Sequence, residues 1–376
     1  MDATAEFLSG FGEEPGYLDF ASFGPLSAAV VAESAAQQEA VRRARPGAGD
    51  RLQDGVARLR DAAAAVTGFR ADQIVFQPST TQGITQAVFG VTGGLLVSPA
   101  DYPALPIAAD RAAEALQVVT PLPLDADGGR VTPGGVRDAL TSTTAGVLVS
   151  AVDARTGHVA DLDGIRQVIG DRLLIVDAVQ GLGAIEAPWD AADVVACGGQ
   201  KWLRAGWGAA FLALSDRAVH RLTPVLSGVG GIDDVDSGWD RVPPPAPGAA
   251  GFQISEPDPL AAGRLCAALL DLAAAGPAAV AERVAARATQ VLALADEFGL
   301  PVVSPRAASE RAGIVVVEPL PERLTALTAA LFNHGVSVTI RDGRVRFSPH
   351  AGTTEETIGM LSSALTAYAT AVRPVR

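Results

Sequence analysis

Residues 192–204 read ADVVACGGQKWLR. The apolar run in this stretch, DVVAC, is typical of a strand covered on both faces, and Lys201 follows it after two glycines and Gln200. A second apolar run, LLIVD, ends at Asp177. The chain therefore offers an acid at the end of one strand and an amine just after the next, where α/β sheets usually place functional groups.

Outward from this stretch, strand-like and helix-like segments alternate from about residue 70 to 215. The strand-like runs are IVFQ (74–77), LLVS (95–98), GVLVS (146–150), LLIV (173–176), DVVAC (193–197) and GAAFLAL (208–214). Helical stretches begin at Thr81, near residue 103 and near residue 161. Because the runs are continuously apolar, they predict an α/β fold with a mostly parallel central sheet and helices on both faces.

The stretch RVPPPAPGAAG (241–251) breaks this pattern, since it is rich in Pro and Gly and has no apolar period. Two long helical stretches follow it, and then the strand-like runs 313–319, 336–340 and 344–348. A terminal helix is predicted to open with a capping box of Thr353 and Glu356. We expect a large domain over residues 15–245, and a smaller α+β domain made of residues 1–14 and 246–376.

Composition restricts the class of partner. The 376 residues carry a formal net charge of −13, which argues against nucleic acid or an anionic membrane as the main partner. No uncharged apolar stretch approaches the ~18 residues that a membrane span needs. Cys197 and Cys266 lie in apolar settings and are interpreted as reduced core residues. The acidic N-terminus does not resemble a secretory signal, so a cytoplasmic protein is expected.

The segment QPSTTQGITQAV (77–88) opens a helix directly after a strand-like run. Ser79 and Gln82 have the spacing of a capping box, and the free N–H groups of such a helix start favour a bound phosphate. Thr80 and Thr81 could add hydroxyl donors. Taken alone, a capped helix start is more often structural than a binding site.

Asp177 and Lys201 together suit a pyridine-aldehyde cofactor. A buried carboxylate needs a cationic partner, which a protonated pyridine nitrogen would supply, and an amine can form a Schiff base with the aldehyde. Each residue also has a structural interpretation, Asp177 as a turn former or helix cap and Lys201 as a lysine that extends to the surface from a strand edge. Lys201 is unusual because the chain strongly prefers arginine.

Six segments in this order resemble the class V aminotransferases, a family of fold-type I pyridoxal-phosphate enzymes. They are LDFASFGPLS (18–27), STTQGI (79–84), DYPALP (101–106), VDAVQGLG (176–183), GGQKW (198–202) and RFSPHAGTTEE (346–356). The family includes cysteine desulfurases, kynureninase and isopenicillin N epimerase-like proteins. The resemblance implies pyridoxal 5'-phosphate as cofactor, a small amino-acid substrate, and a homodimer with the active site at the subunit interface.

The resemblance also implies roles for individual residues. Lys201 matches the Schiff-base lysine, and Asp177 matches the partner of the pyridine nitrogen. The remaining cofactor contacts are expected from Ser79, Thr80 and Thr81 at the phosphate, Tyr102 stacked on the ring, Gln180 at the ring hydroxyl, and Gln200. Arg346 matches the arginine that binds the substrate carboxylate, where a planar guanidinium suits a bidentate pair. Phe23 is expected to line the substrate side.

Three departures from the family pattern affect these roles. Gly198 and Gln200 stand where the family often has serine and histidine, so one phosphate hydroxyl is lost and glutamine must replace a histidine contact. The segment FQISE (252–256) stands where a threonine would reach the partner's cofactor, and Glu256 would repel a phosphate there. The stretch 331–345 contains no cysteine, which argues against desulfuration through a protein-bound persulfide.

The sequence favours an amino-acid aminotransferase that works through an aldimine of Lys201. A β-eliminating C–S lyase is a close alternative, and an epimerase is a further one, because the step after removal of the α-proton decides which bond is broken. A non-catalytic relative that acts as a binding or scaffold protein remains a hypothesis of another class. The four histidines show no ligand spacing, so no metal is expected.

Overall fold

A computed structural model describes residues 3–126, 130–233 and 241–372. Its centre is a seven-stranded sheet in the order β1-β7-β6-β5-β4-β2-β3. The strands are β1 (Ile74–Gln77), β2 (Gly93–Val97), β3 (Val119–Pro123), β4 (Thr144–Ser150), β5 (Leu173–Asp177), β6 (Val194–Gly198) and β7 (Ala210–Leu214). Only β7 runs antiparallel to its neighbours, β1 and β6. The predicted, mostly parallel sheet is confirmed.

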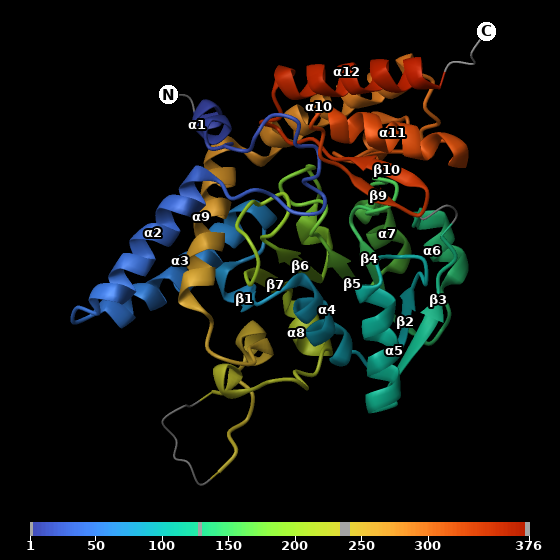
Figure 1. Cartoon of the computed structure of the whole chain (residues 1–376). Coiled ribbons are helices and arrows are strands. Elements are labelled where there is room, and N and C mark those ends of the chain that lie inside the picture. The colour runs from blue at the N-terminus through green and yellow to red at the C-terminus, as the bar shows by residue number, and fades with distance from the viewer. Residues whose placement is uncertain (1–2, 127–129, 234–240, 373–376) are drawn as a thin grey trace.

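Helices cover both faces of this sheet (Figure 1). One face packs against α4 (Thr80–Phe89), α5 (Ala104–Leu116) and α8 (Asp216–Arg221), and the other against α3 (Ala48–Thr67), α7 (Leu162–Ile169) and α9 (Pro259–Ala275). Val147 and Leu148, adjacent on β4, belong to different hydrophobic clusters because successive side chains of a strand point to opposite faces. This explains why the strands appear in the sequence as continuous apolar runs.

A smaller α+β unit follows, as the sequence predicts. Its antiparallel sheet has the order β8-β10-β9, and a third hydrophobic cluster lies between this sheet and its helices. The elements are β8 (Val315–Val317), β9 (Thr339–Arg341), β10 (Arg344–Phe347), α10 (Pro277–Glu297), α11 (Pro321–Asn333) and α12 (Glu355–Ala371). Figure 1 shows this unit above the carboxyl edge of the large sheet. The exact boundaries of the two domains stay a prediction.

The N-terminal segment 16–27 connects the two sheets. Tyr17 and Asp19 form parallel bridges with Ser337 and Ser348 beside the small sheet. Further along, the Gly24 N–H donates to the carbonyl of Gln200 at 2.8 Å. The segment therefore joins the small domain to the loop that follows β6. The other N-terminal helices are α1 (Ala3–Ser9) and α2 (Ala28–Arg43), and α6 (Pro133–Ala139) precedes β4.

Two local expectations were wrong. The terminal helix is capped by Thr354, whose Oγ1 accepts from the Thr357 N–H, whereas Thr353 accepts from the His350 N–H, so the capping box of Thr353 and Glu356 is not formed. The edge strand β3 was missed, because its sequence VTPLP contains two prolines, which are tolerated only at a sheet edge.

No single helix in the described part of the chain is long and apolar enough to cross a membrane. Only α9 and α10 taken together have the length and apolar composition of a span, and the chain bends by 86° between them.

Candidate active site

The predicted acid and amine meet at the carboxyl edge of the large sheet. Asp177 ends β5, and Lys201 lies in the loop after β6, the next strand of the sheet. Because β1 runs parallel to β6, the start of α4 reaches the same edge. A small pocket opens there, lined by Tyr102, Ser150, Val152, Ala154, Asp177, Val179, Gln180 and Lys201. The sequence-predicted core of the site is therefore brought together.

Lys201 is the single lysine among the 29 lysines and arginines of the chain. Its Nζ lies 5.4 Å from the centre of the Tyr102 ring. Burial lowers the pKa of Lys201 to about 8, with the positive charge of Arg346 adding to the effect and the negative charge of Asp177 opposing it. An amine with this pKa has a substantial neutral fraction near neutral pH, which both a Schiff-base lysine and a general base require.

Asp177 is only 3% exposed. Its Oδ1 accepts a hydrogen bond from the Val179 N–H at 2.9 Å. Burial raises the pKa of Asp177 to about 6; the Val179 N–H and the Lys201 charge oppose this shift, and the nearby carboxylate of Asp101 adds to it. A cationic ring nitrogen at this point would compensate the buried charge, so the carboxylate fits the partner of a pyridine nitrogen.

The start of α4 fits a phosphate. Ser79 caps the helix as predicted, since its Oγ accepts from the Gln82 N–H at 3.1 Å. The Thr80 hydroxyl is buried and has no hydrogen-bond partner within the described part of the chain, whereas Thr81 is exposed. A buried hydroxyl without a partner at a helix N-terminus suits an anionic oxygen. The residues present therefore fit the phosphate end of the predicted cofactor.

Gln200 lies beside this hydroxyl. A Cβ atom placed on Gly198 would stand 2.3 Å from the Gln200 Oε1 and 2.7 Å from the Thr80 Oγ1. The carboxamide of Gln200 therefore fills the space that a side chain at position 198 would take. The two departures from the family pattern in this loop are structurally one change.

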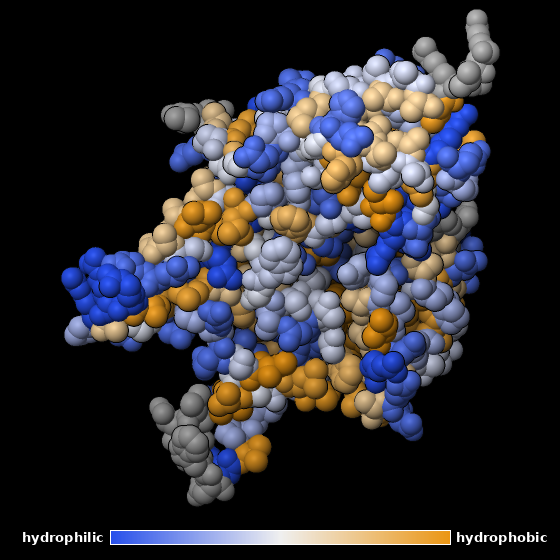
Figure 2. Space-filling view, in the orientation of Figure 1, coloured by the Kyte–Doolittle hydropathy of each residue, from blue (hydrophilic) through white to orange (hydrophobic). Residues whose placement is uncertain are grey.

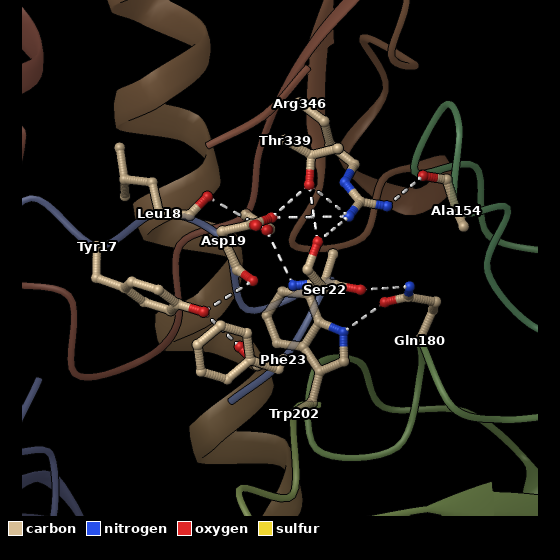
Figure 3. A network of polar contacts seen from close by, with 12 residues as sticks. Tyr17, Leu18, Asp19, Ser22, Phe23, Ala154, Gln180, Trp202, Thr339 and Arg346 are labelled. Atoms are coloured by element: carbon tan, nitrogen blue, oxygen red, sulfur yellow. Dashed lines mark hydrogen bonds and ion pairs between the residues drawn. The ribbon is translucent and has the colours of Figure 1, made fainter. Parts of the chain in front are cut away.

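Gln180 holds two parts of the site together (Figure 3). Its Oε1 accepts from the Trp202 indole N–H at 2.9 Å, and its Nε2 donates to the Ala21 carbonyl at 2.9 Å. The amide is thereby fixed between the Lys201 loop and the N-terminal segment, with one N–H left for a ligand.

Arg346 extends from β10 of the small sheet toward the same pocket. Its Nη1 donates to the carbonyl of Ala154, a residue that lines the pocket, at 3.1 Å. Its Nη2 donates to the hydroxyls of Ser22 at 2.8 Å and Thr339 at 2.9 Å. Figure 3 shows these contacts around one guanidinium. Burial lowers the pKa of Arg346, and Asp19 opposes that shift. The arginine is well placed to meet a carboxylate.

Phe23 and His350 lie in different surroundings. Phe23 is 38% exposed, packs against Tyr17 and Trp207 at the surface, and is not among the residues that line the pocket. His350 is fully buried, with its Nε2 at 2.9 Å from the Trp202 carbonyl and its Nδ1 accepting from a backbone N–H. Burial lowers the pKa of His350 to about 3, so it is a neutral core histidine.

Sequence reasoning missed several polar residues at the site. Asp101 accepts from the Ser150 hydroxyl at 2.6 Å and from its N–H at 3.1 Å, and it holds the turn that carries Tyr102. Asp19, Ser22 and Thr339 surround Arg346. The one sequence signal that could have indicated Asp101 is its position just before Tyr102. The segment with Asp19 lies more than 300 residues from Arg346, and no local pattern joins them.

Residues 3–126, 130–233 and 241–372 contain no group of three or more His, Cys, Asp or Glu side chains that could hold a metal ion.

A parallel sheet that presents an amine, a buried carboxylate and a hydroxyl-bearing helix start at one edge defines a pyridoxal-phosphate enzyme of fold type I. Residues 17–344 match the family Aminotransferase class-V, and the chain belongs to this family. Class V enzymes depend on pyridoxal 5'-phosphate, so the predicted cofactor is confirmed.

Individual relatives are more distant. The chain is similar to a probable cysteine desulfurase of Methanothermobacter thermautotrophicus, with 31% identity over 193 residues, and the match spans about half the length of this curated relative, 47% of each protein. The fold is similar to that of a cysteine desulfurase from Thermococcus onnurineus NA1, with a TM-score of 0.83, 18% identity and 95% of both chains covered. It is also similar to the cystine C–S lyase C-DES, solved with its product cysteine persulfide, with a TM-score of 0.80, 19% identity and coverage of 94% and 97%.

Proposed function

We propose that this enzyme breaks the C–S bond of a cysteine-like amino acid by β-elimination, without forming a persulfide on the protein. The observation that carries the proposal is the position of the two cysteines of the chain, which are both buried and free. Burial raises the pKa of the Cys197 thiol and that of the Cys266 thiol, which makes both poor nucleophiles. The released sulfur must then leave with a small-molecule product.

The relatives support the lyase hypothesis more than the aminotransferase hypothesis. The aminotransferase interpretation that the sequence favours is not confirmed, since the names of the similar proteins are those of desulfurases and of a C–S lyase. The lyase alternative therefore has more support. The family membership alone leaves the reaction class open.

The roles of this chain's residues follow from their geometry. Bound pyridoxal phosphate would withdraw electrons from the substrate α-carbon, with Asp177 at its ring nitrogen and Thr80 at its phosphate. Arg346 would bind the substrate carboxylate, and Lys201 would take the α-proton in its neutral form. Loss of this proton and of the β-sulfur, as a thiol or hydropersulfide, leaves 2-aminoacrylate, which water converts to pyruvate and ammonia. The reaction needs no outside oxidant or reductant.

The test compares products in solution. The cofactor-loaded enzyme, given L-cystine, is expected to release pyruvate, ammonia and cysteine hydropersulfide in equal amounts, and a variant with Cys197→Ala and Cys266→Ala should retain this activity. Loss of activity in that cysteine-free variant, together with a persulfide on the wild-type protein, would refute the proposal. A keto-acid product with one equivalent of aminated cofactor would establish the aminotransferase, and inversion of the α-carbon without pyruvate would establish the epimerase.

Attachment of the cofactor to Lys201 can be tested separately, because Lys201 is the only lysine in the sequence. Borohydride reduction in the presence of pyridoxal phosphate should label only the peptide that contains Lys201, and a Lys201→Ala variant should stay unlabelled. A folded wild-type protein that takes up no label would support the hypothesis of a non-catalytic relative.

The homodimer and the cytoplasmic location remain proposals. Exposed hydrophobic side chains that support a protein contact are Val225, Val229 and Ile254. On the face in Figure 2, hydrophobic residues gather along the lower edge of the large domain. Sedimentation of the holoenzyme would measure the oligomeric state.

The family resemblance implies that residues 252–256 approach the partner's cofactor. Phe252 in this segment is buried, and its carbonyl accepts from Gln77 Nε2 at 3.2 Å, while Glu256 is exposed.

A further inference from the structure

The guanidinium of Arg346 is already engaged by a carboxylate of the same chain. Asp19 Oδ1 lies 3.7 Å from Arg346 Nη2, and the two side chains are only 17% and 15% exposed. The hydroxyl of Thr339 stands between them, donating to Asp19 Oδ1 at 2.7 Å and accepting from Arg346 Nη2 at 2.9 Å. The arginine predicted to bind the substrate carboxylate thus has a resident acidic partner (Figure 3).

Both hydroxyl protons of this cluster are used in hydrogen bonds within it. Thr339 has one hydroxyl proton, and it is donated to the carboxylate, which can only accept. The Ser22 hydroxyl lies 2.8 Å from the Thr339 Oγ1, so in this pair Ser22 must be the donor. Neither hydroxyl therefore offers a proton to an incoming carboxylate unless the cluster rearranges.

The remaining donors of Arg346 are few. Nη2 donates to both hydroxyls, and Nη1 donates once to the Ala154 carbonyl. The Nε–H is buried and has no hydrogen-bond partner among the described residues. A side-on carboxylate uses Nε and Nη2 together, so a substrate that binds Arg346 in this way must take Nη2 from a hydroxyl, beside the negative charge of Asp19.

We propose that Asp19 lowers the affinity of this site for carboxylate-bearing substrates, because its negative charge opposes a second one beside Arg346. The inference rests on the proposed role of Arg346 in the proposed function. Asp19 touches no reacting atom in this scheme and acts as a positioning residue. Weak substrate binding and rapid product release are the expected consequence of such a built-in competitor.

The test removes the charge and keeps the shape. Asp19→Asn retains an oxygen that accepts from Thr339, so the cluster can persist without its negative charge. With the holoenzyme, binding is followed by the change in cofactor absorbance on titration with L-alanine, which has no β-sulfur to lose, and with ethylamine, which lacks the carboxylate. We expect the Kd for L-alanine to fall by about three- to tenfold, given the modest strength of partly exposed charge pairs, and the Kd for ethylamine to stay unchanged.

Matched controls separate this effect from others. Glu318→Gln removes a carboxylate that pairs with Arg344 on the same strand β10, at the surface, and should leave both Kd values unchanged. Asp19→Ser provides a second charge-free variant if the asparagine protein does not fold. A higher Kd for L-alanine, an equal shift for ethylamine, or the same shift in Glu318→Gln would overturn the proposal. Because L-alanine cannot undergo C–S cleavage, this result is independent of whether the enzyme is a lyase.

Discussion

Gly198→Ala is expected to weaken the binding of pyridoxal phosphate. The added Cβ would stand 2.3 Å from the Gln200 Oε1 and 2.7 Å from the Thr80 Oγ1, and real Cβ atoms essentially never approach other atoms so closely. Both of these atoms are at the ends of side chains, and so they can move away. Their movement would displace the two groups that the structure places beside the predicted phosphate.

The magnitude follows from these contacts. Overpacking a buried site costs about 1–3 kcal/mol, and we expect the lower end because flexible side-chain ends can yield. Loss of one hydrogen bond to a charged group costs about 1.5–3 kcal/mol, which corresponds to a roughly 10- to 100-fold higher Kd for the cofactor. The effect on cofactor binding should therefore exceed the effect on the stability of the cofactor-free protein.

The assay titrates the cofactor-free protein with pyridoxal phosphate and, separately, with pyridoxal, which lacks the phosphate. Gly198→Ala should weaken the binding of pyridoxal phosphate and leave that of pyridoxal unchanged. Gly199→Ala is the matched control, since its Cβ would lie 2.7 Å from that of Ala205 and would destabilise the fold without contacting Thr80. In a Gln200→Ala background, the added methyl group should weaken the binding of pyridoxal phosphate by a smaller factor. Equal losses for both ligands, or an unchanged affinity for pyridoxal phosphate, would refute the reasoning.

Three further perturbations test the site and its support. In the cofactor-free protein, carbamylation of Lys201 by cyanate, followed by peptide mass spectrometry, should have a pH midpoint near the Lys201 pKa of about 8. Asp177→Asn should lower this midpoint, because it removes a negative charge that favours the protonated amine. A midpoint near that of free lysine would contradict the burial effect. Arg204→Met should lower the free energy of unfolding, measured in urea, by about 3–5 kcal/mol, because the buried guanidinium donates to the carbonyls of Gly10 and Pro25. Arg264→Met, at a partly exposed position, should cost far less. Burial lowers the pKa of His350 in the folded protein to about 3 from its ordinary value of 6.5, so the unfolded chain binds more protons between these two pH values. The free energy of unfolding should therefore fall by about 2 kcal/mol from pH 7 to pH 5. A His350→Gln variant that loses stability equally over this range would disprove the linkage.

The sequence predicts the large sheet well, because its strands are apolar on both faces. The run LLIVD and the run DVVAC became β5 and β6 within a residue, and strand ends placed Asp177 and Lys201 together. The edge strand β3 could not be found in this way, since an edge strand is partly exposed and tolerates proline. The contacts between Asp19 and Arg346 could not be predicted either, because they join segments at opposite ends of the chain.

The departures from the family pattern act on separate parts of the site, and this separation bears on the reaction. Gly198 and Gln200 lie beside Thr80, at the phosphate end, and they leave Lys201 and Asp177 in place. In the proposed C–S lyase reaction, the missing cysteine concerns only the fate of the sulfur. The proposed proton removal by Lys201 and the proposed carboxylate binding by Arg346 are common to transamination, elimination and epimerisation, and these two departures impair neither step. Under the proposed function, this chain therefore differs from the family pattern in how the cofactor is held and in where the sulfur goes, because an enzyme without an accessible cysteine can release sulfur only into solution.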